Sequence, residues 1–127
     1  MQAKDVRLLI VDDLDFMRTA IRDILRAAGF LKLDEAVNGR EALMKYEHIR
    51  PDLVLLDIAM PEMDGITVLS RLMRTHPMAR VVMCSALGEE QMIIRSIQLG
   101  ARDFIVKPFK PERVTSAVKK VLGLDAV

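Results

Sequence analysis

Five times along the chain, a short run of apolar residues is followed by a stretch in which apolar residues recur every three or four positions. The short runs predict strands, and the stretches with a period near 3.6 predict amphipathic helices. The expected strands are Val6–Val11, Leu33–Val37, Leu53–Leu56, Val81–Cys84 and Asp103–Val106. The apolar positions of the expected helices fall within 16–28, 42–46, 66–73, 89–99 and 114–122.

Three of these strands, the first, third and fourth, are continuously apolar rather than alternating. That pattern is typical of parallel strands that helices cover on both faces. Five strand–helix repeats within 127 residues predict one doubly wound α/β domain with a five-stranded parallel sheet and five helices. We expect residues 1–127 to form this single domain, with no output domain attached.

Composition and charge narrow the classes of function. The chain is 51% hydrophobic, which is enough for a core, and its net charge of +1 with 29% charged residues shows no basic stripe for nucleic acid. Cys84 is the only cysteine and lies in an apolar run, so we expect a buried thiol and no disulfide. The chain shows neither a signal peptide nor an apolar stretch of ~20 residues. We therefore predict a soluble, cytoplasmic protein without a membrane partner.

Polar side chains follow four of the predicted strands, at the point where each strand ends. Asp12 and Asp13 follow the first strand, Asp57 the third, Ser85 the fourth and Lys107 the fifth. Each residue alone is most simply a cap or a turn residue. In a parallel sheet, however, all four ends lie at one edge, where ligands bind in doubly wound folds. We therefore expect three carboxylates, a hydroxyl and an ammonium to meet there.

This set of residues favours phosphoryl chemistry. Two like charges ~4 Å apart repel by roughly 4 kcal/mol at an effective dielectric near 20, so the cluster raises its pKa values or binds a cation. An all-oxygen site suits Mg²⁺, whereas zinc is disfavoured because His48 and His76 lie near helix ends, where we expect surface residues. Asp57 is the best candidate nucleophile. Lys107 and the cation would neutralise phosphoryl charge.

Several motifs now resemble the receiver domain of two-component response regulators, over Val6 to about Leu122. The matching segments are Val11-Asp12-Asp13, Asn38-Gly39-x-Glu41-Ala42-Leu43, Leu55-Leu56-Asp57, Met60-Pro61-x-Met63-Asp64-Gly65, Ser85-Ala86 and Gly100-Ala101-x-Asp103-Phe104-Ile105-Val106-Lys107-Pro108-Phe109. The Phe16-Met17-Arg18 segment is most similar to stand-alone chemotaxis regulators of the CheY type.

The resemblance implies a flavodoxin/CheY-like fold, whose strand order 2-1-3-4-5 is known from CheY itself. It also implies that a histidine kinase phosphorylates Asp57. Asp13, Asp57 and the backbone carbonyl of Ala59 would bind Mg²⁺, and Asp12 would act through a metal-bound water. Lys107 would pair with the phosphoryl group, with a cis bond to the following proline.

The same resemblance implies a switch rather than an enzyme. Ser85 would bond the phosphoryl oxygens, and Phe104 would turn inward, which changes the surface of helix 4, strand 5 and helix 5. That surface would bind a target such as a flagellar motor switch protein, and a phosphatase is a further expected partner. Chemotaxis members often have tyrosine at the Phe104 position. Ala59 and Leu87 flank the site and are apolar, so neither can orient a hydrolytic water, and we expect both to influence the lifetime of the phosphorylated state.

Three alternatives remain at this point. A single-domain phosphorelay intermediate would share most of these motifs. A phosphatase of the haloacid dehalogenase type also uses an Asp nucleophile, and Asp13-Leu14-Asp15 mimics its Asp-x-Asp motif, but Met17 departs from its pattern and the chain lacks room for a capping domain. A flavin-binding electron carrier is disfavoured, because no phosphate-binding loop follows the first strand.

Overall fold

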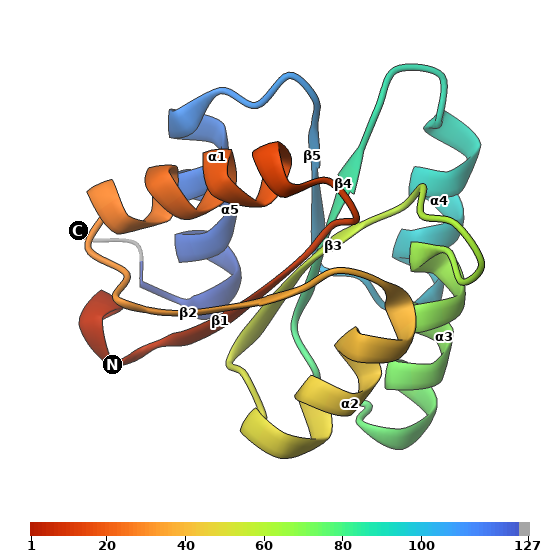
Figure 1. The fold of residues 1–127 in the computed structure, drawn as a ribbon, viewed down its shortest axis with the longest axis horizontal. Coiled ribbons are helices and arrows are strands. Elements are labelled where there is room, and N and C mark those ends of the chain that lie inside the picture. Colours follow the sequence, from red (N-terminus) through yellow and green to blue (C-terminus); the bar gives the residue numbers. More distant parts are fainter. Residues whose placement is uncertain (125–127) are drawn as a thin grey trace.

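The computed structural model describes residues 1–124 and contains one five-stranded sheet. Helices cover both faces of this sheet (Figure 1). All neighbouring strands are parallel, and their order is β2-β1-β3-β4-β5, as the resemblance implied. The strands are β1 (Arg7–Val11), β2 (Lys32–Ala36), β3 (Leu53–Asp57), β4 (Val81–Ser85) and β5 (Asp103–Val106). The helices are α1 (Asp15–Ala27), α2 (Gly39–Ile49), α3 (Gly65–Thr75), α4 (Glu90–Leu99) and α5 (Pro111–Leu122), and a short 3₁₀ turn, Ala3–Asp5, precedes β1.

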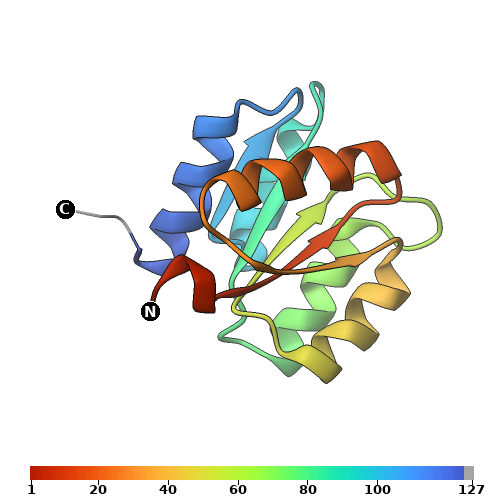
Figure 2. The same cartoon turned by 60° about the vertical axis from the view of Figure 1, so that its left-hand side comes forward.

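Two hydrophobic cores lie on opposite faces of the sheet because successive side chains of a strand point to opposite sides. On one face, Leu8 and Ile10 of β1 pack with Leu25 of α1 and with α5. On the other face, Leu9 and Val11 pack with α2 and α3. Figure 2 shows α1 and α5 on one side of the sheet and α2 and α3 on the other. The expected doubly wound α/β fold is therefore confirmed.

Strand burial explains why the five apolar runs differ in strength. Every residue of β3 and β4 is buried, as their continuous apolar runs predict. The edge strand β2 is mostly half-exposed and contains Lys32, Asp34 and Glu35. An edge strand needs only a partial apolar pattern, which is why this run is weak in the sequence.

Local sequence signals start and stop the helices close to the predicted positions. The Asn38 side chain accepts a hydrogen bond of 2.8 Å from the Glu41 N–H at the start of α2, and Asp64 caps α3 in the same way. Pro111 begins α5, where its missing N–H has no helical partner to lose. Gly100, at φ 121°, ends α4 in a conformation that favours glycine.

The two histidines differ from each other in burial. His48 is exposed, as predicted, whereas His76 is half-buried at the end of α3. His76 ends α3 with its ring 4.9 Å from that of Tyr46, and its Nε2 lies 2.6 Å from Glu47 Oε1. The α2–α3 contact covers this ring, which helix-end position alone does not reveal.

Cys84 is buried, as predicted. None of the helices within residues 1–124 has the length and apolar character needed to span a bilayer.

Candidate functional site

Three carboxylates meet at the carboxyl edge of the sheet, as the strand-end pattern predicts. Asp12 and Asp13 follow β1, and Asp57 ends β3, its neighbour in the sheet. One carboxylate oxygen from each residue lies within 4.8 Å of the others. Asp12 and Asp57 are buried, and Asp13 is half-buried. This placement follows from parallel pairing, which brings the ends of neighbouring strands together.

Within residues 1–124, Lys107 is the only lysine whose ammonium group contacts these carboxylates. Its Nζ donates to Asp57 Oδ1 at 3.0 Å and to Asp12 Oδ2 at 3.3 Å. Its backbone N–H donates to the Ser85 carbonyl at 2.8 Å, which extends the β4–β5 pairing by one residue. The Lys107–Pro108 peptide bond is cis, as expected. Lys107 therefore joins the ends of β1, β3 and β5.

Burial and charge repulsion leave Asp57 with an unusual affinity for protons. Burial, together with the charges of Asp12 and Asp13, raises the pKa of Asp57 to about 6 against the opposing hydrogen bond from Lys107. Burial alone would lower the pKa of Lys107, but its hydrogen bond to Asp57 and the nearby carboxylates outweigh burial and raise it. The pair therefore holds an ammonium beside a carboxylate that is partly protonated near pH 6.

The donor set fits a hard divalent cation. Three carboxylates and one ammonium leave two negative charges, which a divalent ion would neutralise. All available donors are oxygens, as Mg²⁺ and Ca²⁺ prefer. The carboxylates of Asp12, Asp13 and Asp57 are the groups that would hold such an ion. The division that the resemblance implies, with Asp13, Asp57 and the backbone carbonyl of Ala59 as direct ligands and Asp12 acting through water, stays a prediction. Ala59 lies in the exposed loop that follows β3, so its carbonyl role stays a prediction.

Ser85 has a buried hydroxyl with no hydrogen-bond partner among the described residues. Its side chain lies at the end of β4, next to β3 in the sheet. A buried hydroxyl without a partner costs stability, and such a group calls for an explanation. Asp57, the last residue of β3, pairs with Cys84, the residue before Ser85.

Phe104 lies away from the carboxylates, in an open apolar groove between α4 and β5. The groove is lined by Ala86, Leu87, Ile93, Ile94, Ile97 and Val106 together with Phe104. Leu87 is 83% exposed at its rim. Glu89 Oε1 accepts a hydrogen bond of 2.6 Å from the Ala86 N–H and so holds the loop between Ser85 and this groove. The loop that follows Ser85 therefore supplies Ala86 and Leu87 to the same groove in which Phe104 of β5 lies.

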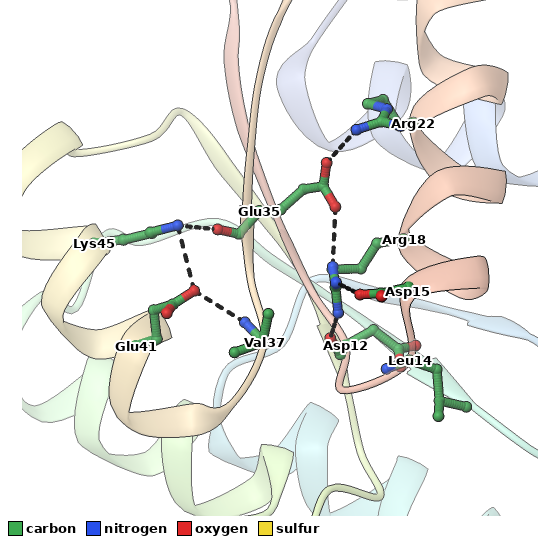
Figure 3. A network of polar contacts seen from close by, with 9 residues as sticks. All are labelled: Asp12, Leu14, Asp15, Arg18, Arg22, Glu35, Val37, Glu41 and Lys45. Atoms are coloured by element: carbon green, nitrogen blue, oxygen red, sulfur yellow. Dashed lines mark hydrogen bonds and ion pairs between the residues drawn. The ribbon is translucent and has the colours of Figure 1, made fainter.

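Two residues support the site although their motifs indicate no role for them. A Cβ atom on Gly65 would collide with the Asp57 carbonyl oxygen, so only glycine allows the loop after β3 to fold back this closely. Arg18 is buried, and its guanidinium contacts Asp12, Asp15 and Glu35 (Figure 3). Spacing does not indicate either role, because each depends on a contact between segments.

Asp15 does not join the cluster of Asp12, Asp13 and Asp57. Its side chain is 92% exposed and pairs with Arg18 in the first turn of α1. The Asp13-Leu14-Asp15 segment therefore lacks the converging pair of carboxylates that the phosphatase interpretation requires, and the third carboxylate comes from β3 instead.

Fold and site together define a doubly wound α/β domain with an acidic, lysine-bridged centre at the carboxyl edge of its sheet. A family model described as the response regulator receiver domain matches residues 8–119. The chain therefore belongs to the response regulator receiver domain family.

Several proteins similar to this chain are named as chemotaxis proteins. The chemotaxis protein CheY of Bacillus subtilis is 53% identical over 117 residues, which cover 92% of this chain and 98% of that protein. The CheY protein of Thermotoga maritima is 50% identical over 115 residues, which cover 91% of this chain and 96% of that protein. A solved CheX–CheY–BeF3–Mg²⁺ complex from Borrelia burgdorferi matches with a TM-score of 0.86 and 43% identity, covering 91% of this chain and 88% of that one.

Proposed function

We propose that this domain is a phosphorylation-dependent switch that accepts a phosphoryl group on Asp57. The observation that carries the proposal is the Lys107 ammonium, which contacts both Asp57 and Asp12 inside a cluster with two excess negative charges. Phosphoryl transfer depends mainly on positioning and on neutralising charge, and this centre supplies both. A bound Mg²⁺ would neutralise the remaining charge and help to orient the phosphoryl oxygens.

The covalent step uses an oxygen of Asp57 as the nucleophile. This oxygen forms a bond to phosphorus while the bond between phosphorus and the imidazole nitrogen of a phosphohistidine donor breaks. The leaving nitrogen keeps the electron pair and takes a proton from water. Lys107 stays beside the acceptor as a point charge, and the Ser85 hydroxyl donates to a phosphoryl oxygen. The domain is changed by the reaction, so we propose a switch and not an enzyme that turns over substrates.

Movement of Ser85 would carry the change to the partner-binding surface. The hydroxyl is unpaired before phosphorylation, so a phosphoryl oxygen offers it a hydrogen bond that the described residues of the unmodified site do not supply. Movement toward Asp57 would shift the loop that Glu89 holds and free space for Phe104 to turn inward. A bias of ~3 kcal/mol changes the ratio of two such packings by over a hundredfold. The surface formed by α4, β5 and α5 would then bind the target.

The chemotaxis role rests on the relatives. Proteins named chemotaxis protein CheY are about half identical to this chain over most of both lengths. We infer a cytoplasmic regulator that receives its phosphoryl group from a histidine kinase and acts on a flagellar motor switch protein. The Borrelia burgdorferi CheY is named in a complex with CheX, BeF3 and Mg²⁺, which supports a partner that recognises the phosphorylated form.

The acceptor assignment is tested with acetyl phosphate. We expect the protein to gain one acid-stable, alkali-labile phosphoryl group when Mg²⁺ is present, measured by intact mass. Asp57→Ala should abolish labelling, whereas Asp15→Ala, a matched change of an exposed neighbouring aspartate, should leave it intact. Labelling of Asp57→Ala, or repeated turnover of p-nitrophenyl phosphate, would refute the proposal.

The partner assignment is tested by affinity capture with purified candidates. Beryllofluoride with Mg²⁺ should increase binding to a flagellar motor switch protein. Ile97→Glu, which places a charge in the apolar groove, should remove that increase while leaving phosphorylation of Asp57 unchanged. Equal capture with and without beryllofluoride would exclude this target.

A further inference from the structure

We propose that Arg18 is a positioning residue for the divalent-cation site and that Glu35 holds it in place. The proposal rests on the function proposed above, since it names what places the carboxylates at the end of β1. It concerns residues outside the cluster of Asp12, Asp13, Asp57 and Lys107, and it depends on contacts between α1, β2 and the loop after β1 (Figure 3).

Arg18 is a buried cation, and each of its three guanidinium nitrogens donates to a named acceptor. It is 6% exposed, although arginine is seldom this buried without partners. Its Nε donates to Glu35 Oε1 at 2.9 Å, one terminal nitrogen donates to the Asp12 carbonyl at 2.6 Å, and the other pairs with Asp15. The planar guanidinium thus joins the start of α1, the end of β1 and the edge strand β2.

The contact with the Asp12 carbonyl is the one that concerns the cation site. The carbonyl of Asp12 and the N–H of Asp13 lie in one rigid peptide plane. A donor that fixes this carbonyl therefore fixes the plane from which the Asp13 side chain departs. The Asp12 N–H donates to the Ala36 carbonyl at 3.2 Å, so both main-chain polar groups of Asp12 are held by other segments. Arg18 supplies the bond on the side that faces Asp13.

Glu35 compensates the charge of Arg18 and holds its orientation. The second oxygen of Glu35 accepts a bond of 2.5 Å from Arg22, and the Glu35 main-chain carbonyl accepts one from Lys45. Within this network, the carboxylates of Asp15 and Glu35 balance the positive charges of Arg18 and Arg22. Arg18 therefore adds no excess charge to the cation site. Its effect on cation binding is therefore geometric.

The matched pair of variants is Arg18→Lys and Arg22→Lys. Both keep the charge and remove a guanidinium that contacts Glu35, but only Arg18 contacts the Asp12 carbonyl. A lysine offers a point charge and cannot donate in three fixed in-plane directions at once. Partners that orient metal ligands typically change metal affinity by 10–100-fold, so we expect Arg18→Lys to weaken Mg²⁺ binding about tenfold. Arg22→Lys should stay within about twofold of the unmodified protein, because it does not touch the loop.

The measurement is isothermal titration calorimetry with MgCl2 at 25 °C, alongside urea unfolding without metal. A purely structural role would lower the free energy of unfolding in Arg18→Lys and leave the Mg²⁺ affinity of the folded protein unchanged. Glu35→Gln weakens the anchor of Arg18 without touching the loop, and we expect it to lose about threefold in affinity.

The outcomes separate this inference from the proposed function. If the unmodified protein does not bind Mg²⁺, the proposed function itself fails. If it binds Mg²⁺ and Arg18→Lys binds equally well, or Arg22→Lys loses as much, the role of Arg18 is refuted while the proposed function stands. Should Arg18→Lys fail to fold, Glu35→Gln decides: an affinity equal to that of the unmodified protein refutes the role, and a loss that Arg22→Lys does not share supports it.

Discussion

We expect the ionised Asp57 carboxylate to lower the stability of the unmodified domain at neutral pH, and a neutral replacement measures by how much. Burial, together with the charges of Asp12 and Asp13, raises the pKa of Asp57 from 3.8 to about 6. The folded state therefore holds the proton of this group more tightly than the unfolded state. Between about pH 4 and pH 6, the unfolded chain loses this proton first, so the free energy of unfolding falls as pH rises. The loss levels off about one pH unit above the folded-state pKa, when the group is deprotonated in both states.

The size of the effect follows from the shift. The difference between 3.8 and about 6 corresponds to about 3 kcal/mol at 1.36 kcal/mol per pKa unit. The asparagine side chain introduced by Asp57→Asn would keep an oxygen for the Lys107 hydrogen bond without carrying a charge into the cluster. We therefore expect Asp57→Asn to unfold with a free energy about 1–3 kcal/mol higher at pH 7.5, and with little difference at pH 4.

Urea unfolding at 25 °C with EDTA, followed by circular dichroism at several pH values, measures this difference. Asp5→Asn is the control, because it neutralises an exposed aspartate far from the cluster along β1. The advantage of Asp57→Asn should shrink when Mg²⁺ is added, since a ligand that binds the folded state stabilises it. An Asp57→Asn protein that is no more stable at pH 7.5, or equally stabilised at pH 4, would refute the account of charge repulsion at this site.

Four further variants probe the site. Lys107→Met removes the ammonium group from the buried cluster and should lower the free energy of unfolding by about 3–5 kcal/mol. Urea unfolding in EDTA at pH 7.5 measures this loss, and a loss under ~1 kcal/mol would contradict the ion-pair geometry. Gly65→Ala brings a methyl group against the Asp57 carbonyl and should cost at least ~2 kcal/mol by thermal unfolding, an expectation that unchanged stability would overturn. Asp13→Asn removes one negative charge and should weaken Mg²⁺ binding at least tenfold by calorimetry; equal affinity would remove Asp13 from the ligand set. Ala59→Asn introduces a side chain able to orient water, so phosphate loss from labelled protein should change severalfold, and an identical rate would end that idea.

The sequence alone predicts the fold because each structural signal is local. Continuous apolar runs mark β3 and β4 as strands buried on both faces, and both are fully buried. Asn38 and Pro111 mark helix starts through groups within a few residues of themselves. The convergence of Asp12 and Asp57 also follows, because parallel strands end at the same edge whatever their detailed packing.

Local sequence signals do not predict contacts between segments that are far apart along the chain. His76, which follows α3, is half-buried because α2 packs beside it, and its position near a helix end does not reveal this contact. Glu35 lies on an edge strand, where a solvated charge is expected, yet it binds Arg18 of α1. Periodicity places a residue on a face of its own element and says nothing about which charged group the neighbouring element brings to it.

The amino-acid sequence by itself determines which residues reach the reactive edge, since strand periodicity and strand ends depend on neighbours along the chain. Only the tertiary structure decides that Lys107 contacts two carboxylates at once and that Arg18 donates a hydrogen bond to the Asp12 carbonyl. It also decides that the Ser85 hydroxyl has no hydrogen-bond partner among the described residues. The physical reason is the distance along the chain over which each kind of interaction is determined. Apolar burial along a strand is set by local spacing, whereas hydrogen bonds and ion pairs need two atoms within about 3 Å, and packing of whole elements sets that distance.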